Sequence, residues 1–420
     1  MSERARRSPA DISSGQSRRH KPDYWLLILA SLLLTIGLVV VYSISPGLAA
    51  SQGISQNYFV TKQLIAVALG IVGFTVAAAL PIGFWRRNAK NLALLAVVGA
   101  VIVMITPINA AYPAHRWIRL GGFSFQIAEL IKLALSVWLA AFLAERWRNR
   151  ELNDFGRTVR PLLILLVVLA VIVAKLESDL GSAGVMIVMI GAAAFTAGVP
   201  MKRIALISGL VAIVLVLAVA SSGYRRERLA TYLHPQSNCQ GSGYQACQAL
   251  ISVGSGGLFG LGLGYSVQAY GYTPEASNDS IFAIMAEEFG FVGSFLIVVI
   301  YGAFITRLKQ IIERTADPFS RLLVVCVLAW FSTQIIINIG AMIGLLPLKG
   351  ITLPLISQGG TSLVFLAVAL GMVFQVSRYT SYKVIEPVVN FDETHTQGNS
   401  FDGRGVRRPH NPSIITRPRT

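Results

Sequence analysis

Apolar runs long enough to cross a lipid bilayer recur along the chain and constrain its fold more than any other feature. A membrane-spanning helix needs about 20 mainly apolar residues. With 54% hydrophobic and 13% charged residues, the chain is also too apolar for a soluble globular protein. We therefore predict an all-α polytopic membrane protein with about ten transmembrane helices. The predicted helices cover Tyr24–Tyr42, Gln63–Leu80, Leu92–Ile108, Ala128–Ala144, Pro161–Lys175, Leu180–Val199, Ile204–Ser222, Ser280–Ile305, Leu322–Leu345 and Ser362–Val376.

The positive charges indicate how these helices are oriented. Cytoplasmic loops of membrane proteins carry an excess of Lys and Arg. With the N-terminus in the cytoplasm, 27 of the 36 Lys and Arg residues fall on the cytoplasmic side, and both termini are predicted to lie there. The net charge of +16 therefore reports orientation rather than nucleic-acid binding. Residues 1–22 and 380–420 are polar and are predicted to be disordered cytoplasmic tails around a membrane domain over residues 23–379.

Eight basic residues fall on the outer side against this bias. They could bind an anionic group such as a lipid pyrophosphate, or they could reach for lipid headgroups. Arg116 and the cluster around Arg225 are the strongest candidates, because they lie near aromatic residues or loop ends. The eight are Lys62, Arg116, Arg119, Lys175, Arg225, Arg226, Arg228 and Lys349.

Acidic residues are scarce, at 20 in 420, and three of them stand at the start of the eighth predicted helix. In the stretch GYTPEASNDSIFAIMAEEFG, Asp279 marks the boundary between loop and apolar segment, and Glu287 and Glu288 lie two turns further in. A carboxylate in or near hydrocarbon is costly and marks a candidate functional site. Asp279 is a candidate general base. A capping role at the start of the helix is the equal alternative.

Other polar residues lie within or beside the predicted helices. Glu129 and Lys132 are three positions apart, so a helix places them on one face, where an ion pair between packed helices is favoured over direct catalysis. Asp179 is favoured as a helix cap, with a place in a substrate cavity as the alternative. Gln334 and Asn338 share a helical face and are expected to form hydrogen bonds between helices.

The longest outer loop, residues 223–278, contains a cysteine pair and a glycine-rich stretch. Cys239 and Cys247 could form a disulfide in an outer compartment, and the sequence leaves this open. The stretch SVGSGGLFGLGLG lacks the register of a nucleotide-binding fingerprint. It is predicted to be a re-entrant or interfacial segment that packs against the membrane helices. No nucleotide or organic cofactor is expected.

A second irregular stretch, GLLPLKGITLPLISQGGTSL, follows the ninth predicted helix. Its prolines and glycines interrupt the helical pattern, so it is expected to line a cavity rather than face lipid. One carboxylate near water together with outer cations suits the activation of a hydroxyl group against an anionic leaving group. A transporter with intramembrane charges is the alternative class.

Several motifs resemble the SEDS family (shape, elongation, division and sporulation) of bacterial polytopic glycosyltransferases. The resemblance runs from about Tyr24 to Tyr379 and includes RWIRLGG…AELIK, ESDLGSA, YRRERL, SVGSGGLFGLGLG, the stretch around Asp279 and the stretch after the ninth helix. The form KGITLP and the YRRERL segment are more similar to the division-type FtsW than to the elongation-type RodA. The chain departs from the family pattern at Ile127-Ala128, at Glu177-Ser178 and at Gln358.

The resemblance implies polymerisation of lipid II into peptidoglycan at the outer face of the bacterial cytoplasmic membrane, with inversion of configuration. It implies that Asp279 is the catalytic base and that undecaprenyl pyrophosphate is the leaving group. Arg116, Arg225, Arg226, Lys349 and Ser357 would surround the substrate, with Asp179 at the same cavity. A divalent cation, Mg²⁺ or Mn²⁺, could assist. A class B penicillin-binding protein and other divisome proteins are the expected partners. Lipid II flipping and a non-catalytic divisome scaffold are the alternatives.

Overall fold

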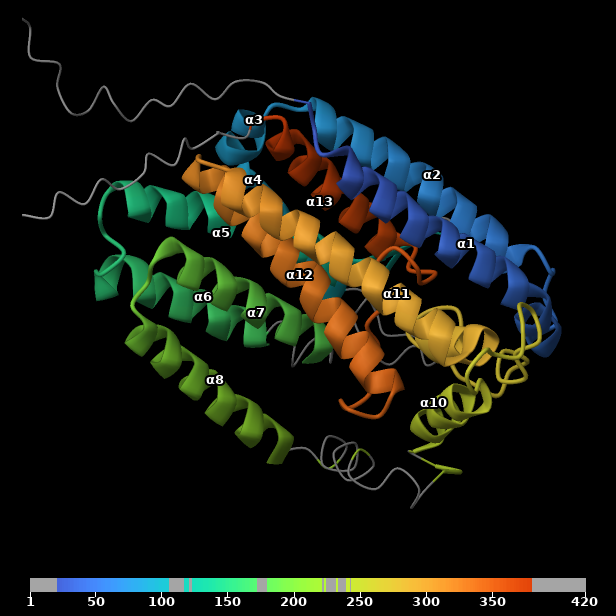
Figure 1. The fold of residues 1–420 in the computed structure, drawn as a ribbon. Coiled ribbons are helices and arrows are strands. Elements are labelled where there is room, and N and C mark those ends of the chain that lie inside the picture. Colours follow the sequence, from blue (N-terminus) through green and yellow to red (C-terminus); the bar gives the residue numbers. More distant parts are fainter. Residues whose placement is uncertain are drawn as a thin grey trace, which may run out of the picture. The chain divides into compact units, whose positions relative to one another are not determined.

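A helix occupies each of the ten predicted spans. The computed structural model describes residues 21–105, 117–120, 123–171, 180–220, 223, 232, 239–241 and 243–379, all of which fall in one unit, Met1–Tyr382. The helical fold class is therefore confirmed (Figure 1). The ten helices are α1 (Tyr24–Gln52), α2 (Tyr58–Ala79), α4 (Ala89–Ile105), α5 (Ile127–Arg148), α6 (Arg160–Val171), α7 (Leu180–Ala197), α8 (Met201–Ala220), α11 (Ile281–Arg314), α12 (Pro318–Met342) and α13 (Thr361–Ser377).

Burial separates a central pair of helices from peripheral ones. Within the described residues, five helices are long and apolar enough to cross a membrane, namely α1, α2, α5, α11 and α12. In the most apolar part of α5 and α12, 83% and 67% of the residues are buried, against 28% in α1, α2 and α11. The central helices α5 and α12 therefore pack against protein, whereas the other three present apolar side chains outward, as expected for helices that face lipid.

The predicted ends of two helices are wrong. α1 continues past Tyr42 to Gln52, because tertiary packing buries Ile44, Leu48 and Ala49 in a stretch whose polarity suggested a loop. It ends at Gly53, whose left-handed conformation is a common helix stop. α11 continues past Ile305 to Arg314, with Ile311 among the residues buried in this extension.

Smaller elements add to the ten helices. They are α3 (Ile82–Arg87), the π-helix η2 (Phe155–Val159), α10 (Tyr244–Ser255) and an antiparallel hairpin of β1 (Trp117–Leu120) and β2 (Phe123–Gln126). The hairpin corrects the all-α prediction locally. Its residues include Trp, Ile and Phe, which favour strands.

The glycine-rich segment, residues 254–264, packs against α11 where that helix is interrupted. Gly290 has a φ of 67°, which breaks the helix, and a Cβ atom on Gly260 would lie 2.1 Å from the carbonyl oxygen of Glu288. The amide of Leu261 donates to the carbonyl of Glu287 at 2.9 Å, and the amide of Phe291 donates to the carbonyl of Gly257 at 2.9 Å. The predicted packing of this segment on the membrane helices is confirmed, and its backbone is satisfied by protein.

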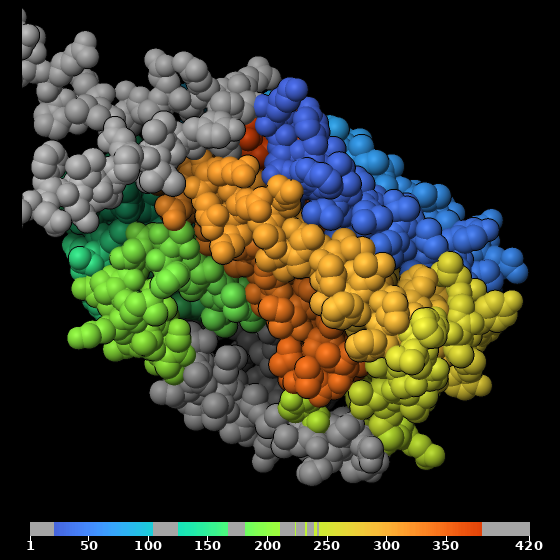
Figure 2. Space-filling view, viewed as in Figure 1, coloured from blue at the N-terminus to red at the C-terminus, as the bar shows by residue number. Residues whose placement is uncertain are grey.

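The α12–α13 loop, residues 343–360, folds back into the bundle. A Cβ atom on Gly37 in the middle of α1 would lie 2.4 Å from the carbonyl oxygen of Ile356. The hydroxyl of buried Tyr301 on α11 donates to the carbonyl of Pro354. The loop is therefore enclosed by α1 and α11, which satisfies the rule that irregular backbone at membrane depth must be covered by protein. Figure 2 shows the face on which α11 runs beside α1, with the segment from α10 onward next to the start of α11.

Candidate active site

Asp279 lies in a tight turn directly before α11. The turn, residues 275–280, is closed by the carbonyl of Glu275, which accepts hydrogen bonds from the amides of Asn278 (2.9 Å) and Ser280 (3.2 Å). Glu275 itself has a φ of 52°, a conformation that residues other than glycine adopt rarely and mainly at functional sites. The turn holds Asp279 at the N-terminal end of α11.

The capping alternative for Asp279 receives no support from this geometry. Ser280, not Asp279, occupies the N-cap position of α11, and its side chain makes no capping hydrogen bond. The Ser280 hydroxyl instead donates to the carbonyl of Pro274 at 2.9 Å and accepts from the side-chain amide of Gln245 at 3.2 Å. The carboxylate of Asp279 is thus left for another role.

The carboxyl group of Asp279 combines enclosure with an unused acceptor. The residue as a whole is half-buried, but its Oδ1 atom is enclosed and has no hydrogen-bond partner. Burial, reinforced by the negative charge of Glu275, raises the pKa of Asp279 to about 7, and the side-chain amide of Gln245 opposes this shift. A general base is most effective when its pKa lies near the working pH, so this carboxyl is suited to proton transfer.

The α12–α13 loop forms the other side of this site. The side-chain nitrogen of Asn338 donates to the carbonyl of Asp279 and to the carbonyl of Ile351, each at 2.7 Å. A Cβ atom on Gly350 would lie 3.6 Å from Asp279 Oδ2, so the half-buried Lys349 is carried on the backbone next to the carboxylate. The structure therefore brings together Asp279, Asn338 and the loop of Lys349, three predicted site residues from separate segments.

Ser357 has a role within the loop. It is buried, and its hydroxyl accepts a 2.7 Å hydrogen bond from the amide of Leu353. The neighbouring Gln358 donates from its amide to the carbonyl of Ser277 at 2.9 Å and from its side chain to the carbonyl of Phe59 at 2.8 Å. The departure from the family pattern at Gln358 thus falls at a junction between the loop, the Asp279 turn and α2.

Glu129 and Lys132 form the expected ion pair deep between helices. Their nitrogen and oxygen lie 2.7 Å apart, and both side chains are buried. Lys132 Nζ also lies 5.2 Å from the ring centre of Trp330 on α12, a favourable cation–π arrangement. Because Trp330, Gln334 and Asn338 follow one another at intervals of four on α12, one helical face leads from this pair to Asp279. The contact joins α5 to α12, as the structural interpretation expects.

Glu287 and Glu288 accept hydrogen bonds from the glycine-rich segment and the residues that follow it. The carboxylate of Glu287 accepts hydrogen bonds from the hydroxyls of Ser252 and Ser266 and from the amide of Val267. The carboxylate of Glu288 accepts from the amide of Gly264 at 2.7 Å and from the hydroxyl of Ser43 at 3.1 Å. These two residues hold the segment in place. Their structural role could not be predicted from the sequence, because their donors come from other parts of the chain.

The remaining candidates divide into one described pair and a group that lies elsewhere. The structure joins Cys239 and Cys247 in a disulfide with 5.6 Å between the Cα atoms, the pairing that the sequence left open. Gln245, between them, was missed by sequence reasoning because an amide in a polar loop carries no distinguishing signal.

Arg116, Asp179, Arg225 and Arg226 lie outside the described residues, as do the predicted tails at residues 1–20 and 380–420. Within the described residues, no group of three or more His, Cys, Asp or Glu side chains could hold a metal ion.

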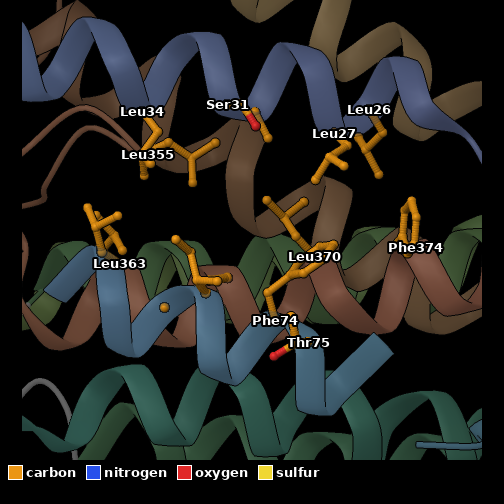
Figure 3. A pocket seen from close by; sticks show the side chains of 15 residues that line it. Leu26, Leu27, Ser31, Leu34, Phe74, Thr75, Leu355, Leu363, Leu370 and Phe374 are labelled. Atoms are coloured by element: carbon orange, nitrogen blue, oxygen red, sulfur yellow. The ribbon is translucent and has the colours of Figure 1, made fainter. Parts of the chain in front are cut away.

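An apolar groove of about 280 Å³ lies between α1, α2 and α13. Figure 3 shows Leu26, Leu27 and Leu34 of α1 facing Leu363 and Leu370 of α13 across it. Leu355 of the α12–α13 loop also lines the groove, so one loop contributes to both the groove and the site around Asp279. Ser31 and Thr75 are the polar residues of a lining that is otherwise hydrocarbon or glycine.

Comparison with known proteins gives a consistent result. Residues 24–382 match the family model described as "Cell cycle protein", which groups FtsW, RodA and SpoVE. The chain is 36% identical over 372 residues to the stage V sporulation protein E of Bacillus subtilis, covering 87% of this chain and all of that protein. It is 38% identical over 361 residues to a probable peptidoglycan glycosyltransferase FtsW of Saccharophagus degradans, covering 84% of this chain and 92% of that protein.

Solved structures show the same fold. A chain of a peptidoglycan synthase complex that coordinates polymerization and crosslinking superposes with a TM-score of 0.70 at 24% identity, covering 85% of this chain and 98% of that chain. The rod shape determining protein RodA of Thermus thermophilus superposes with a TM-score of 0.60 at 25% identity, covering 86% of this chain and 98% of that chain.

Proposed function

The chain belongs to the FtsW, RodA and SpoVE family of cell cycle proteins, and from this premise we propose that it is a peptidoglycan glycosyltransferase that polymerises lipid II during cell division. The observation that carries the proposal is the carboxyl of Asp279, whose enclosed Oδ1 has no partner and whose pKa of about 7 suits a general base. The relatives named FtsW support the activity and the division role.

In the proposed reaction, Asp279 accepts the proton of the attacking hydroxyl group. The 4-hydroxyl of the terminal GlcNAc of one lipid-linked disaccharide donates its proton to Asp279 while its oxygen attacks the anomeric carbon of MurNAc on another. A new glycosidic bond forms as the bond to the pyrophosphate oxygen breaks, and that oxygen leaves with the electron pair. Attack from the face opposite the leaving group inverts the anomeric configuration.

Cations stabilise the departing undecaprenyl pyrophosphate in this proposal. Lys349 lies on the loop beside Asp279, and we assign Arg116, Arg225 and Arg226 to the same task on sequence grounds. We also propose that Mg²⁺ or Mn²⁺ binds together with the pyrophosphate. The described residues have no cluster of metal ligands, so the phosphate oxygens and water would supply most of its coordination sphere, and no step is assigned to it.

The apolar groove is proposed to hold part of the hydrocarbon tail of the substrate. Its lining from α1, α2 and α13 is almost wholly hydrocarbon, and Leu355 connects it to the loop that carries Lys349. A polyprenyl chain is a flexible apolar ligand whose burial is favourable in such a lining. This arrangement would place the tail within the bilayer and the pyrophosphate at the outer surface.

A class B penicillin-binding protein is the proposed partner, within a larger set of division proteins. The sequence has no transpeptidase motif, so crosslinking of the glycan strands requires another protein. The similar chain from a complex that coordinates polymerization and crosslinking supports this pairing. The active site would face the outside, with both termini in the cytoplasm.

The test is glycan polymerisation from fluorescent lipid II by the purified protein with its cognate transpeptidase, comparing the wild type with Asp279→Ala and Asp279→Asn. We expect polymer from the wild type and none from either variant, each recovered as a monodisperse protein. Polymer from all three would remove Asp279 from the mechanism. No polymer from the wild type, across partners and divalent cations, together with lipid II movement across vesicles, would replace this proposal with transport.

A further inference from the structure

We propose that Asn338 is a positioning residue whose single side-chain amide fixes Asp279 against the α12–α13 loop, an inference that rests on the proposed function. Asn338 lies near the end of α12, and its side chain is buried, with 1% of its surface exposed. It touches no reacting atom in this scheme. Its effect reaches the reaction through the backbone of Asp279.

The geometry of the amide is specific. Nδ2 of Asn338 donates at 2.7 Å to the carbonyl of Asp279 and at 2.7 Å to the carbonyl of Ile351. An amide nitrogen carries two hydrogens, so both are used. One nitrogen therefore joins the carbonyl of Asp279 in the catalytic turn to the carbonyl of Ile351 in the loop.

A second connection runs parallel to the first. The amide of Gln358 donates to the carbonyl of Ser277 at 2.9 Å. With the turn tied at Ser277 and at Asp279, its carboxylate has a defined position relative to the backbone of Gly350, where a Cβ atom would lie 3.6 Å from Oδ2. Of the two connections, the hydrogen bonds of Asn338 are nearer in sequence to the carboxylate and to Lys349, because they end on Asp279 itself and on Ile351.

The other half of the Asn338 side chain carries a cost to stability. Oδ1 is buried and has no hydrogen-bond partner. A buried acceptor without a partner destabilises a fold, a cost that an apolar residue of similar volume would avoid.

The test uses Asn338→Leu, which removes the donor at similar volume, and Asn338→Asp, which keeps the shape and replaces the amide nitrogen with an oxygen. Both are assayed with the cognate transpeptidase on fluorescent lipid II, and kcat and KM are taken on the monodisperse fraction. We expect kcat to fall at least about tenfold with KM within about twofold, because displacement of a reacting group by about 1 Å can cost a hundredfold in rate. Ser294→Ala is the matched control, since it removes another buried and unpartnered polar atom, on α11, and is expected to retain wild-type kcat.

The outcomes separate this inference from the proposed function. A normal kcat per folded molecule in both Asn338 variants, even with a lower yield, would mark a purely structural residue and overturn the inference, while an inactive Asp279→Asn would leave the proposed function standing. If Asn338→Leu does not fold, Asn338→Asp alone decides, with the same thresholds. A wild type that makes no polymer overturns both.

Discussion

Three carboxylates lie within ten residues around the start of α11, and they fall into two regions with opposite characters. Glu287 and Glu288 face the glycine-rich segment and its continuation, where serine hydroxyls and backbone amides donate to both carboxylates. Asp279 faces the α12–α13 loop with an enclosed oxygen that nothing in the described residues satisfies. The carboxylates of the first region are satisfied within the protein, whereas the carboxylate of the second keeps an enclosed oxygen without a partner.

The difference shows how a costly charge at a membrane boundary can be interpreted. A buried carboxylate with several donors is a structural acceptor whose removal leaves those donors unpaired. A buried carboxylate with an unpaired oxygen and a pKa near neutrality is available for chemistry. Sequence position marks all three carboxylates as costly charges, and their hydrogen-bond partners show which of them serve the structure.

Neutralisation of Asp279 is expected to have the largest effect and tests the contrast between the two regions most directly. Asp279→Asn should lower the polymerisation rate by about a hundredfold or more, because positioned proton transfer contributes about 10² to 10⁴ in rate. Its thermal midpoint should not fall below that of the wild type, since a buried charge is removed. Rate and thermal midpoint are measured on the same preparation. A variant that loses stability but keeps the rate per folded molecule would place Asp279 in the same class as Glu287.

The reverse result is expected at Glu287. Glu287→Ala should destabilise the protein by about 2–4 kcal/mol, because it leaves buried serine and amide donors without an acceptor. The check is the thermal midpoint in detergent, followed by the rate per folded molecule, which should stay close to that of the wild type.

Glu313→Ala is the control for this variant. Glu313 is exposed on the same helix and pairs only loosely with Lys309 at 3.7 Å, so its removal should change stability by less than about 1 kcal/mol. Equal effects of the two substitutions would contradict the structural role of Glu287.

The pH profile sharpens the contrast at Asp279. A general base must be ionised, so kcat/KM should rise about tenfold per pH unit below the pKa of about 7 and level off above it. The same shift affects stability in the opposite direction. A carboxyl whose pKa is raised by folding binds its proton more tightly in the folded state, so stability is lost as pH rises from about 4 to 7.

Asp279→Asn removes this titration and supplies the control. Its thermal midpoint should exceed that of the wild type at pH 8, and the difference should shrink towards pH 4. A kcat/KM that is flat between pH 5.5 and 8 in the wild type would show that another group limits the reaction.

The smallest expected effect is at Glu275. Its negative charge adds to the raised pKa of Asp279. Glu275→Gln should therefore shift the rising limb of the pH profile to lower pH by less than one unit, since Glu275 is exposed and solvent screens its charge. The maximum rate above pH 8 should be unchanged. A shift to higher pH would mean that the hydrogen bond from the side-chain amide of Asn278 to the Glu275 carboxylate, rather than the charge, governs the turn.

Local features of the sequence predicted much of this architecture, and tertiary pairing accounts for what they missed. Apolar runs located the ten helices, and Asp279 stood out because a charge at a membrane boundary is a local signal. The double role of Asn338 could not be predicted, because its two carbonyl partners belong to Asp279 and Ile351, far apart in the chain. The C-terminal end of α1 was missed for the same reason, since its burial depends on residues distant in the chain.

The disulfide has a consequence for the order in which the site gains its structure. Cys239 and Cys247 close a covalent ring around Gln245, whose side chain reaches Ser280 and influences Asp279. The ring persists in the unfolded chain, so Gln245 loses less conformational entropy when it takes its place beside Ser280. A chain with reduced cysteines would lack this restriction and would have to order Gln245 by folding alone.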